Sequence, residues 1–188
     1  MRQYDIANGP GIRSTLFVTG CSRNCFNCFN PEYQNAQFGN VWTDKETKQL
    51  LSWLQAPTNS GLTLLGGEPM ENTDGLTPLI KEIKAALPDK SVWVYSGFTY
   101  DEIIKDPQKK ALLDQCDVLV DGPFVDALKD PGLYFRGSSN QRIIDLQKTR
   151  ETGEITLSGQ TDDNRSLPAF YDSKECLLTN RIYSISLS

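Results

Sequence analysis

The chain has 188 residues, of which 38% are hydrophobic and 23% are charged, a composition typical of a folded domain and unlike that of a disordered or collagen-like chain. Its formal net charge of -5 argues against nucleic acid or an anionic membrane as the main partner, because a surface that follows phosphates needs an excess of Lys and Arg. The sequence shows no signal-peptide core and no apolar run long enough to cross a bilayer, so we expect a cytoplasmic protein without a membrane partner.

Histidine is absent from the chain, whereas five cysteines are present. The absence of His excludes Ser-His-Asp and Cys-His hydrolases, HExxH metalloproteases and most zinc enzymes. Any bound metal must therefore rest mainly on sulfur or carboxylate. An odd number of cysteines, three of them within eight residues, does not indicate a disulfide framework, and the isolated Cys116 and Cys176 are most simply structural thiols.

Apolar and polar residues follow patterns that predict strands alternating with helices. A capping signal at Thr43, for example, precedes apolar residues at helical spacing that continue up to Pro57. In chain order the sequence predicts a strand at 16–18, a helix at 44–55, a strand at 62–67, a helix at 74–87, a strand at 91–97, a helical stretch at 100–115 that is interrupted near Pro107, and strands at 117–122 and 141–146.

Strands separated by helices imply right-handed crossovers and a mostly parallel sheet that is covered on both faces. We therefore expect an α/β fold, an open or partial (β/α) barrel formed by residues 1–158, with residues 159–188 as a C-terminal extension of no assigned role. The predicted strands end in glycine-bearing polar turns, namely TGC, GGEP, YSG and DGP. Because the carboxyl ends of parallel strands meet at one edge of a sheet, these turns should converge on a single site.

Three cysteines, Cys21, Cys25 and Cys28, form a C-x3-C-x2-C pattern on the loop that leaves the first predicted strand. Thiolates at such short intervals can surround one small inorganic core. A cluster that only carries electrons normally has four cysteine ligands, so three leave one iron open to bind a substrate. The alternatives are a zinc knuckle and chance clustering; zinc is disfavoured because it lacks a fourth ligand close in sequence.

The GGEP and YSG turns offer further candidate binding residues. Gly66 and Gly67 allow backbone groups to approach a ligand, and together with Glu68 and Pro69 they could equally form a tight turn with a capping Glu. Ser96 offers a hydroxyl where a ribose could lie, or it is a simple turn residue.

The later loops are more ambiguous. Asp121 ends an apolar strand, where it is either a carboxylate that faces a ligand or a turn or N-cap Asp. Residues 136–142, RGSSNQR, carry two guanidinium groups around a glycine and small polar residues. On physical grounds a solvated loop is the better interpretation of this segment, and an anion-binding nest is the alternative.

The cysteine spacing on that loop resembles the signature of the radical S-adenosylmethionine superfamily. The segments DIANGPGIRSTLFVTGCSRNCFNCFN, LLGGEP, YSGFTYDEI, DVLVDGPF and FRGSSNQRIID together resemble the activating enzymes of anaerobic, class III ribonucleotide reductases, over about residues 5–158. The aromatic residue that usually precedes the third cysteine is replaced by Asn27, as in that branch of the superfamily, and either Phe26 or Phe29 could shield the cluster instead.

This resemblance implies a radical S-adenosylmethionine type of barrel and a four-iron, four-sulfur (4Fe-4S) cluster on the three cysteines, with S-adenosylmethionine on the fourth iron. It implies that the GGEP turn contacts the methionine amino group, that the strand end at Asp121 faces the cosubstrate, and that residues 8–13, NGPGIR, lie near the site. A flavodoxin- or ferredoxin-type donor would supply an electron for reductive cleavage. The resulting 5′-deoxyadenosyl radical would then remove a hydrogen atom from a glycine of the reductase large subunit.

Other functions remain open at this stage. Within the superfamily, the first alternative is an activating enzyme of another glycyl-radical enzyme, such as a formate-lyase type, although those usually keep the aromatic residue. A small-molecule radical enzyme, such as a deazaguanine-forming one, would leave FRGSSNQR unexplained. From a different class, the chain would be a non-catalytic iron–sulfur or zinc-binding module.

Overall fold

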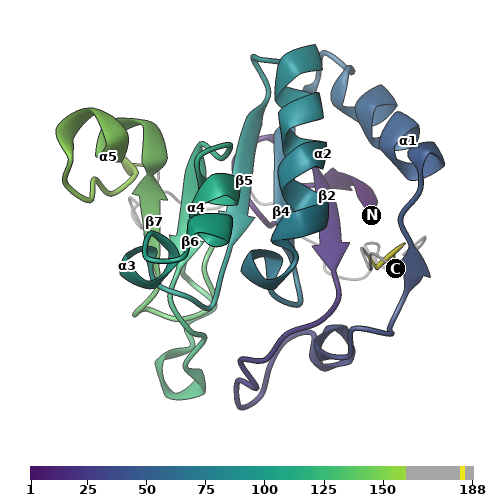
Figure 1. Cartoon of the computed structure of the whole chain (residues 1–188). Coiled ribbons are helices and arrows are strands. Elements are labelled where there is room, and N and C mark those ends of the chain that lie inside the picture. Colours follow the sequence, from purple (N-terminus) through teal and green to yellow (C-terminus); the bar gives the residue numbers. More distant parts are fainter. Residues whose placement is uncertain (160–182, 185–188) are drawn as a thin grey trace.

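The computed structural model describes residues 1–159 and 183–184, and its main element is a six-stranded sheet with the order β1-β2-β4-β5-β6-β7 (Figure 1). The strands are β1 (Arg2–Asp5), β2 (Ile12–Val18), β4 (Asn59–Gly66), β5 (Ser91–Tyr95), β6 (Val118–Asp121) and β7 (Arg142–Asp145). Strands β2, β4, β5 and β6 pair in parallel, whereas β1 and β7 are antiparallel edge strands. The predicted α/β fold with a mostly parallel sheet is therefore confirmed.

Helices fill the connections between the parallel strands, as the sequence predicts. In the described part of the chain they are α1 (Asp44–Leu54), α2 (Thr73–Ala86), α3 (Tyr100–Ile103) and α4 (Pro107–Leu113), whereas α5 (Leu146–Thr152) follows the edge strand β7. Thr43 and Glu46 form a capping box at the start of α1. The interruption predicted near Pro107 separates α3 from α4, where Asp106 accepts a hydrogen bond from the Gln108 N–H at 2.9 Å.

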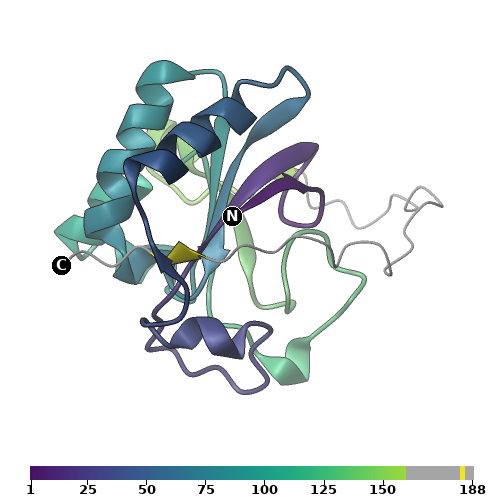
Figure 2. The same ribbon diagram turned by 90° about the vertical axis from the view of Figure 1, so that its right-hand side faces the viewer.

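The helices pack on one face of the sheet, which corrects the expectation that both faces are covered (Figure 2). Residues of all five described helices share one apolar core with alternate strand residues, such as Leu62 and Leu64 of β4. The opposite face carries a smaller cluster around Trp93, Val120 and Ile143, to which no described helix contributes. The reason is topological: the order β2-β4-β5-β6 never reverses, so right-handed crossovers place every helix on the same side.

The edges of the sheet also differ from the expectation. The sequence did not predict β1, because RQYD is short and lacks a clear apolar alternation. Strand β7 runs antiparallel to β6 because residues 122–141 contain only the short 3-10 turn η3 (Asp126–Leu128) and return without a helical crossover. A separate two-stranded sheet pairs β3 (Asn40–Val41) with β8 (Tyr183–Ser184) in parallel.

Two short 3-10 turns lie in the segments that follow β2 and β4, namely η1 (Pro31–Gln34) and η2 (Pro69–Glu71).

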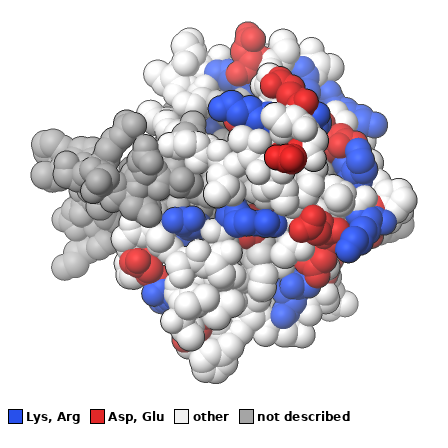
Figure 3. Space-filling model, turned by 90° about the vertical axis from the view of Figure 1, so that its left-hand side faces the viewer, with Lys and Arg blue, Asp and Glu red and all other residues white. Residues whose placement is uncertain are grey.

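On the face seen in Figure 3, Lys and Arg side chains alternate with Asp and Glu and form no continuous basic surface. That face therefore offers no path of positive charge for phosphates. Within the described residues, no helix combines the length and the apolar character that crossing a membrane requires.

Arg13 connects three strands from the face that carries no helices. The residue is 1% exposed, and its guanidinium donates to the Thr63 hydroxyl at 2.8 Å, to the Leu62 carbonyl at 2.7 Å, and to the Ser91 hydroxyl and carbonyl, each at 2.9 Å. It also lies over the Trp93 ring, 5.5 Å from the centroid. Burial lowers the pKa of Arg13 to about 10, so the side chain is still charged at neutral pH.

We expect Arg13→Ala to lower the free energy of unfolding by about 3 kcal/mol, because it leaves the buried carbonyls of Leu62 and Ser91 without their donor. Guanidinium chloride unfolding of the apo-protein, followed by circular dichroism, measures this loss. Arg2→Ala is the control, since its 27% exposed side chain reaches Asp5 only at 3.5 Å and should cost less than about 1 kcal/mol. Equal losses in the two variants would contradict the role given to Arg13.

Candidate functional site

A cavity of about 490 Å³ lies where the parallel strands end. Its wall includes the three clustered cysteines from the loop after β2, residues 66–68 of the GGEP turn after β4, Ser96 after β5 and Gly122 after β6. The turns therefore converge on one site, as a parallel sheet requires. Pro69 and Asp121 were also predicted as binding residues, but neither belongs to the wall.

Two asparagines shape the cysteine loop. Asn24 and Asn27 have φ values of 47° and 53°, in the left-handed region that Asn tolerates better than other residues with a side chain. Each directly precedes a cysteine, Cys25 or Cys28, so each turns the chain just before a thiol. Asn27 therefore has a backbone role, one for which a bulky aromatic residue at the same position would be poorly suited.

Of the two phenylalanines beside Asn27, Phe29 belongs to the cavity wall and Phe26 does not. Phe29 packs on Phe124 with ring centroids 4.7 Å apart, whereas Phe26 is 77% exposed. Gly137 makes room for this contact, because a Cβ there would lie 2.9 Å from the Phe29 ring. The structure thus places Phe29 and not Phe26 in the cavity wall, and the shielding of a cluster by Phe29 stays a prediction.

The cysteine loop and the GGEP turn touch through their backbones. The Gly67 N–H donates to the Val18 carbonyl and the Glu68 N–H donates to the Gly20 carbonyl, each at 2.8 Å. A Cβ on Gly67 would lie 2.4 Å from the Gly20 carbonyl oxygen and 2.8 Å from that of Tyr33. Only glycine fits at this position, because the obstructing atoms belong to the backbone and cannot turn away.

The Glu68 carboxylate ties the end of β4 to the end of β5. It is 1% exposed and accepts hydrogen bonds from the Met70 N–H at 2.9 Å, the Ser96 hydroxyl at 2.9 Å and the Gly97 N–H at 2.8 Å. Burial raises the pKa of Glu68 to about 7, although these hydrogen bonds act in the opposite direction. Ser96 uses its hydroxyl proton here and accepts from the Phe98 N–H at 3.0 Å, so its hydroxyl has only an acceptor lone pair left for a further partner.

Asp121 supports the site from outside the cavity. It is 1% exposed, accepts from the Tyr100 N–H of α3 at 2.7 Å, and forms a two-point pair with the Arg142 guanidinium, whose Nε lies at 2.9 Å. The N-cap of α3 is Thr99, so Asp121 makes tertiary contacts with α3 and with Arg142 rather than capping a helix. The next residue, Gly122, is the one that lines the cavity, so the predicted contact of this strand end with a cosubstrate stays a prediction.

The RGSSNQ segment is a hydrogen-bonded wall of the cavity, which corrects its interpretation as a solvated loop. The Gln141 Oε1 accepts from the Gly137 N–H at 2.8 Å and the Ser138 N–H at 3.2 Å, while its Nε2 donates to the Gly122 carbonyl at 3.0 Å. Arg136, Gly137 and Gln141 line the cavity. Sequence reasoning missed these residues as site residues, although the motif itself had been singled out.

Phe135 precedes this wall in a strained conformation. Its φ of 55° places an aromatic residue in the left-handed region, which is unfavourable for a bulky side chain. Two contacts from β5 hold it there: the Tyr95 hydroxyl donates to its carbonyl at 2.8 Å, and the Trp93 ring meets its ring edge-on with centroids 5.7 Å apart. Strand β5 thereby fixes where Arg136 enters the cavity wall.

The segment 8–13 divides between two roles. Asn8 belongs to the cavity wall, and its side chain donates to Asp5 at 2.8 Å. Arg13, at the other end, lies within the sheet and is absent from the wall. The segment therefore reaches the site at its first residue.

The three thiols suit an iron–sulfur cluster in chemistry and in position. They stand on one loop, they are partly buried, and they line the same cavity. Among the described residues no three His, Cys, Asp or Glu side chains form a ready metal site, so we expect cluster binding to draw the thiols together. Burial raises the pKa of Cys21 to about 11, with the charges of Glu68 and Glu71 acting in the same direction, so metal binding must displace its proton.

Residues 7–144, which include the three cysteines of the cavity wall, match the family model described as a 4Fe-4S single cluster domain, so the chain falls in the class of iron–sulfur proteins with a single cluster. The chain is 39% identical, over 74% of its length and 91% of the relative, to the anaerobic ribonucleoside-triphosphate reductase-activating protein of Haemophilus influenzae. The proteins of the same name from Escherichia coli and Enterobacteria phage T4 are 38% and 37% identical, over 76% and 74% of this chain and 94% and 87% of the relatives. The chain belongs to the family of anaerobic ribonucleoside-triphosphate reductase-activating proteins.

We expect the contribution of Glu68 to stability to decrease as the pH rises. Because burial raises the pKa of Glu68 from 4.5 to about 7, the folded state binds the proton more tightly than the unfolded state does. The contribution is fully present below the unfolded pKa and is lost as the pH rises through the folded one. Unfolding of the wild-type and Glu68→Gln apo-proteins at about pH 5.5 and about pH 8.5 should show a larger deficit for the variant at the lower pH. A deficit that does not change with pH would contradict this assignment.

Proposed function

We propose that this chain activates an anaerobic ribonucleoside-triphosphate reductase by cleaving S-adenosylmethionine reductively at a 4Fe-4S cluster and leaving a radical on a glycine of the reductase large subunit. The observation that carries the proposal is the cavity in which the three-cysteine loop and the GGEP turn meet, in a chain of this family. When bound, the cluster supplies an electron at low potential and S-adenosylmethionine supplies the 5′-deoxyadenosyl group that removes the hydrogen atom.

Within this proposal, the chain's own residues bind and orient the two groups. Cys21, Cys25 and Cys28 would hold the cluster, and a three-thiolate set leaves one iron for the amino and carboxylate groups of the cosubstrate. Gly66 and Gly67 keep the backbone of the β4 turn free of side chains on the cavity side.

The remaining residues hold this backbone in place. Glu68 and Pro69 fix the GGEP turn, since Pro69 is buried in η2 and Glu68 is bonded to the end of β5. Ser96 would accept a hydrogen bond from the ribose, and Asp121 would set the strand end through α3 and Arg142. Tight packing of this kind keeps the reacting groups oriented and limits the access of water.

We further propose that the one-sided sheet is the partial (β/α) barrel of the radical S-adenosylmethionine type. Its support is the strand order, which runs in one direction, and the placement of the cavity at the strand ends. Residues 1–158 would form this domain. Of the proposed extension at 159–188, the structure describes Gly159, Tyr183 and Ser184, and Cys176 lies outside the described residues.

The partners follow from the same proposal. The reductase large subunit is the expected protein substrate, by the name that the relatives share. A flavodoxin- or ferredoxin-type protein would donate the electron, and both partners would be met in the cytoplasm.

Loss of a cluster ligand should abolish activity, whereas loss of the isolated thiol should not. After anaerobic reconstitution and reduction with S-adenosylmethionine present, we expect Cys25→Ala to form no 5′-deoxyadenosine above background. Cys116→Ala should stay within about twofold of wild type, because Cys116 is 1% exposed, donates to the Leu112 carbonyl at 3.4 Å and lies outside the cavity wall. A wild-type protein that binds iron without cleaving the cosubstrate would overturn the catalytic proposal and favour a non-catalytic module.

The partner is tested by adding a candidate reductase large subunit and recording electron paramagnetic resonance spectra. A glycyl radical is expected with the ribonucleotide reductase subunit. A radical that forms on a formate-lyase type of enzyme instead would assign the chain to that group.

Gly67→Ala should disrupt the contact between the cysteine loop and the GGEP turn, because the new Cβ would lie 2.4 Å from the Gly20 carbonyl oxygen. A displacement of about 1 Å at a reacting centre lowers the reaction rate roughly a hundredfold, so we expect the rate of 5′-deoxyadenosine formation to fall by that order. Gly159→Ala is the control, since no atom of the described residues lies within 4 Å of its added Cβ. Full activity of the Gly67→Ala protein would show that the close approach is not required.

A further inference from the structure

Glu71 holds the cysteine loop by the residue that follows its first cysteine. The Glu71 Oε2 accepts from the Ser22 N–H at 2.9 Å, and its Oε1 accepts from the Ser22 hydroxyl. Both donors that Ser22 can offer are therefore bound to one carboxylate. Glu71 ends the short turn η2, which begins at Pro69 of the GGEP turn, so this contact joins the two parts of the site on their outer side.

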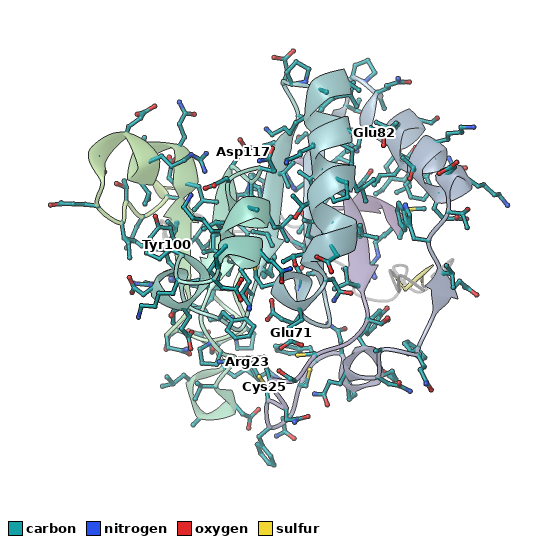
Figure 4. All side chains as sticks on the ribbon, in the orientation of Figure 1. Arg23, Cys25, Glu71, Glu82, Tyr100 and Asp117 are labelled. Atoms are coloured by element: carbon teal, nitrogen blue, oxygen red, sulfur yellow. The ribbon has the colours of Figure 1, made fainter. Side chains whose placement is uncertain are left out.

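The Glu71 carboxylate lies near the cysteines without lining their cavity. Figure 4 shows Glu71, Arg23 and Cys25 close together at one end of the molecule, while Glu82 lies far up helix α2. Glu71 is absent from the wall that contains the three cysteines. Its negative charge nevertheless lies beside the loop, since the Glu71 Oε2 is 2.9 Å from the backbone nitrogen of Ser22, the residue next to Cys21.

The positive charge on the same loop is engaged elsewhere. The Arg23 guanidinium lies over the Phe98 ring, 4.5 Å from its centroid, and its side chain packs against Gly97. No described salt bridge joins Arg23 to Glu71. The Glu71 charge therefore remains uncompensated by Arg23.

Both effects of Glu71 act in one direction on an iron–sulfur cluster. Hydrogen bonds to cluster sulfurs and positive charge stabilise the reduced cluster and raise its reduction potential, whereas negative charge lowers it. Because the Glu71 carboxylate accepts hydrogen bonds from both the Ser22 N–H and the Ser22 hydroxyl, these donors do not bond to the cluster sulfurs. The same carboxylate adds a negative charge beside the loop.

We propose that Glu71 is a positioning residue that keeps the cluster on Cys21, Cys25 and Cys28 at a low reduction potential, by binding both Ser22 donors and by placing a negative charge beside the loop. This inference rests on the proposed function, because it requires the cluster. A low potential serves that function, since a sulfonium is difficult to reduce.

The test is a redox titration of the reconstituted full-length protein, followed by electron paramagnetic resonance, on wild type and three variants. Glu71→Gln keeps the size of the side chain and removes the charge. Ser22→Ala removes the hydroxyl donor and leaves both the charge and the backbone hydrogen bond. Glu82→Gln is the matched control, because it makes the same charge change at an exposed position on α2.

We expect the midpoint potential of Glu71→Gln to shift to a more positive value. Ser22→Ala should not shift to a more positive value, because it keeps the Glu71 charge and frees no donor toward the sulfurs, and Glu82→Gln should not shift at all. The reduced cluster of Glu71→Gln should also form 5′-deoxyadenosine more slowly than the wild-type cluster does. Iron and sulfide contents are measured in parallel, so that a loss of cluster is separated from a change in its potential.

An unchanged potential in Glu71→Gln, or an equal positive shift in Ser22→Ala, would overturn the inference while leaving the proposed function intact. The same holds if Glu71→Gln loads less cluster but the loaded fraction titrates as wild type, since Glu71 would then only support the fold. A wild-type protein that binds no cluster would instead defeat the proposed function, and with it this inference.

Discussion

The site depends on one close approach of two backbones. Gly67 lies against the carbonyl oxygens of Gly20 and Tyr33, at distances that no Cβ could satisfy. This approach places the cysteine loop beside the GGEP turn. The hydrogen bond from the Glu68 N–H to the Gly20 carbonyl then fixes the position of the turn relative to the loop. The buried Glu68 carboxylate then carries the same constraint on to the end of β5. The cysteine loop, the GGEP turn and the end of β5 thus share one connected piece of main chain.

The site residues that the sequence predicted best were those whose chemistry is carried by residue type and spacing. Cys21, Cys25 and Cys28 were found because few other patterns group thiols so closely. Asp121 and Ser96 were harder, because the direction of a side chain at a strand end depends on partners distant in sequence, here Arg142 and Glu68. Gln141 and Phe135 lie in the FRGSSNQR motif that the sequence singled out, but their roles could not be predicted, since these come from tertiary hydrogen bonds and from strain.

In the fold, too, local features could be predicted from the sequence, whereas features that depend on tertiary contacts could not. Hydrophobic periodicity identified the parallel strands and most helices, because it reflects local burial. It did not say that the helices occupy one face, which follows from a strand order that never reverses. The antiparallel direction of β7 was equally hidden, because it depends on the path of the loop that precedes it and not on the composition of RIID. Short edge strands such as β1 are set by their neighbours rather than by their own residues.

The buried guanidinium of Arg13 has a consequence for how the protein unfolds. Its hydrogen bonds reach β4 through Thr63 and Leu62 and β5 through Ser91, while the residue itself belongs to β2. Separating any one of these strands would leave a charged group in an apolar setting with part of its bonding lost. The three central strands should therefore separate together, as one cooperative unit with no partly opened form. A cavity built on the ends of such a unit keeps its shape until the whole sheet is lost.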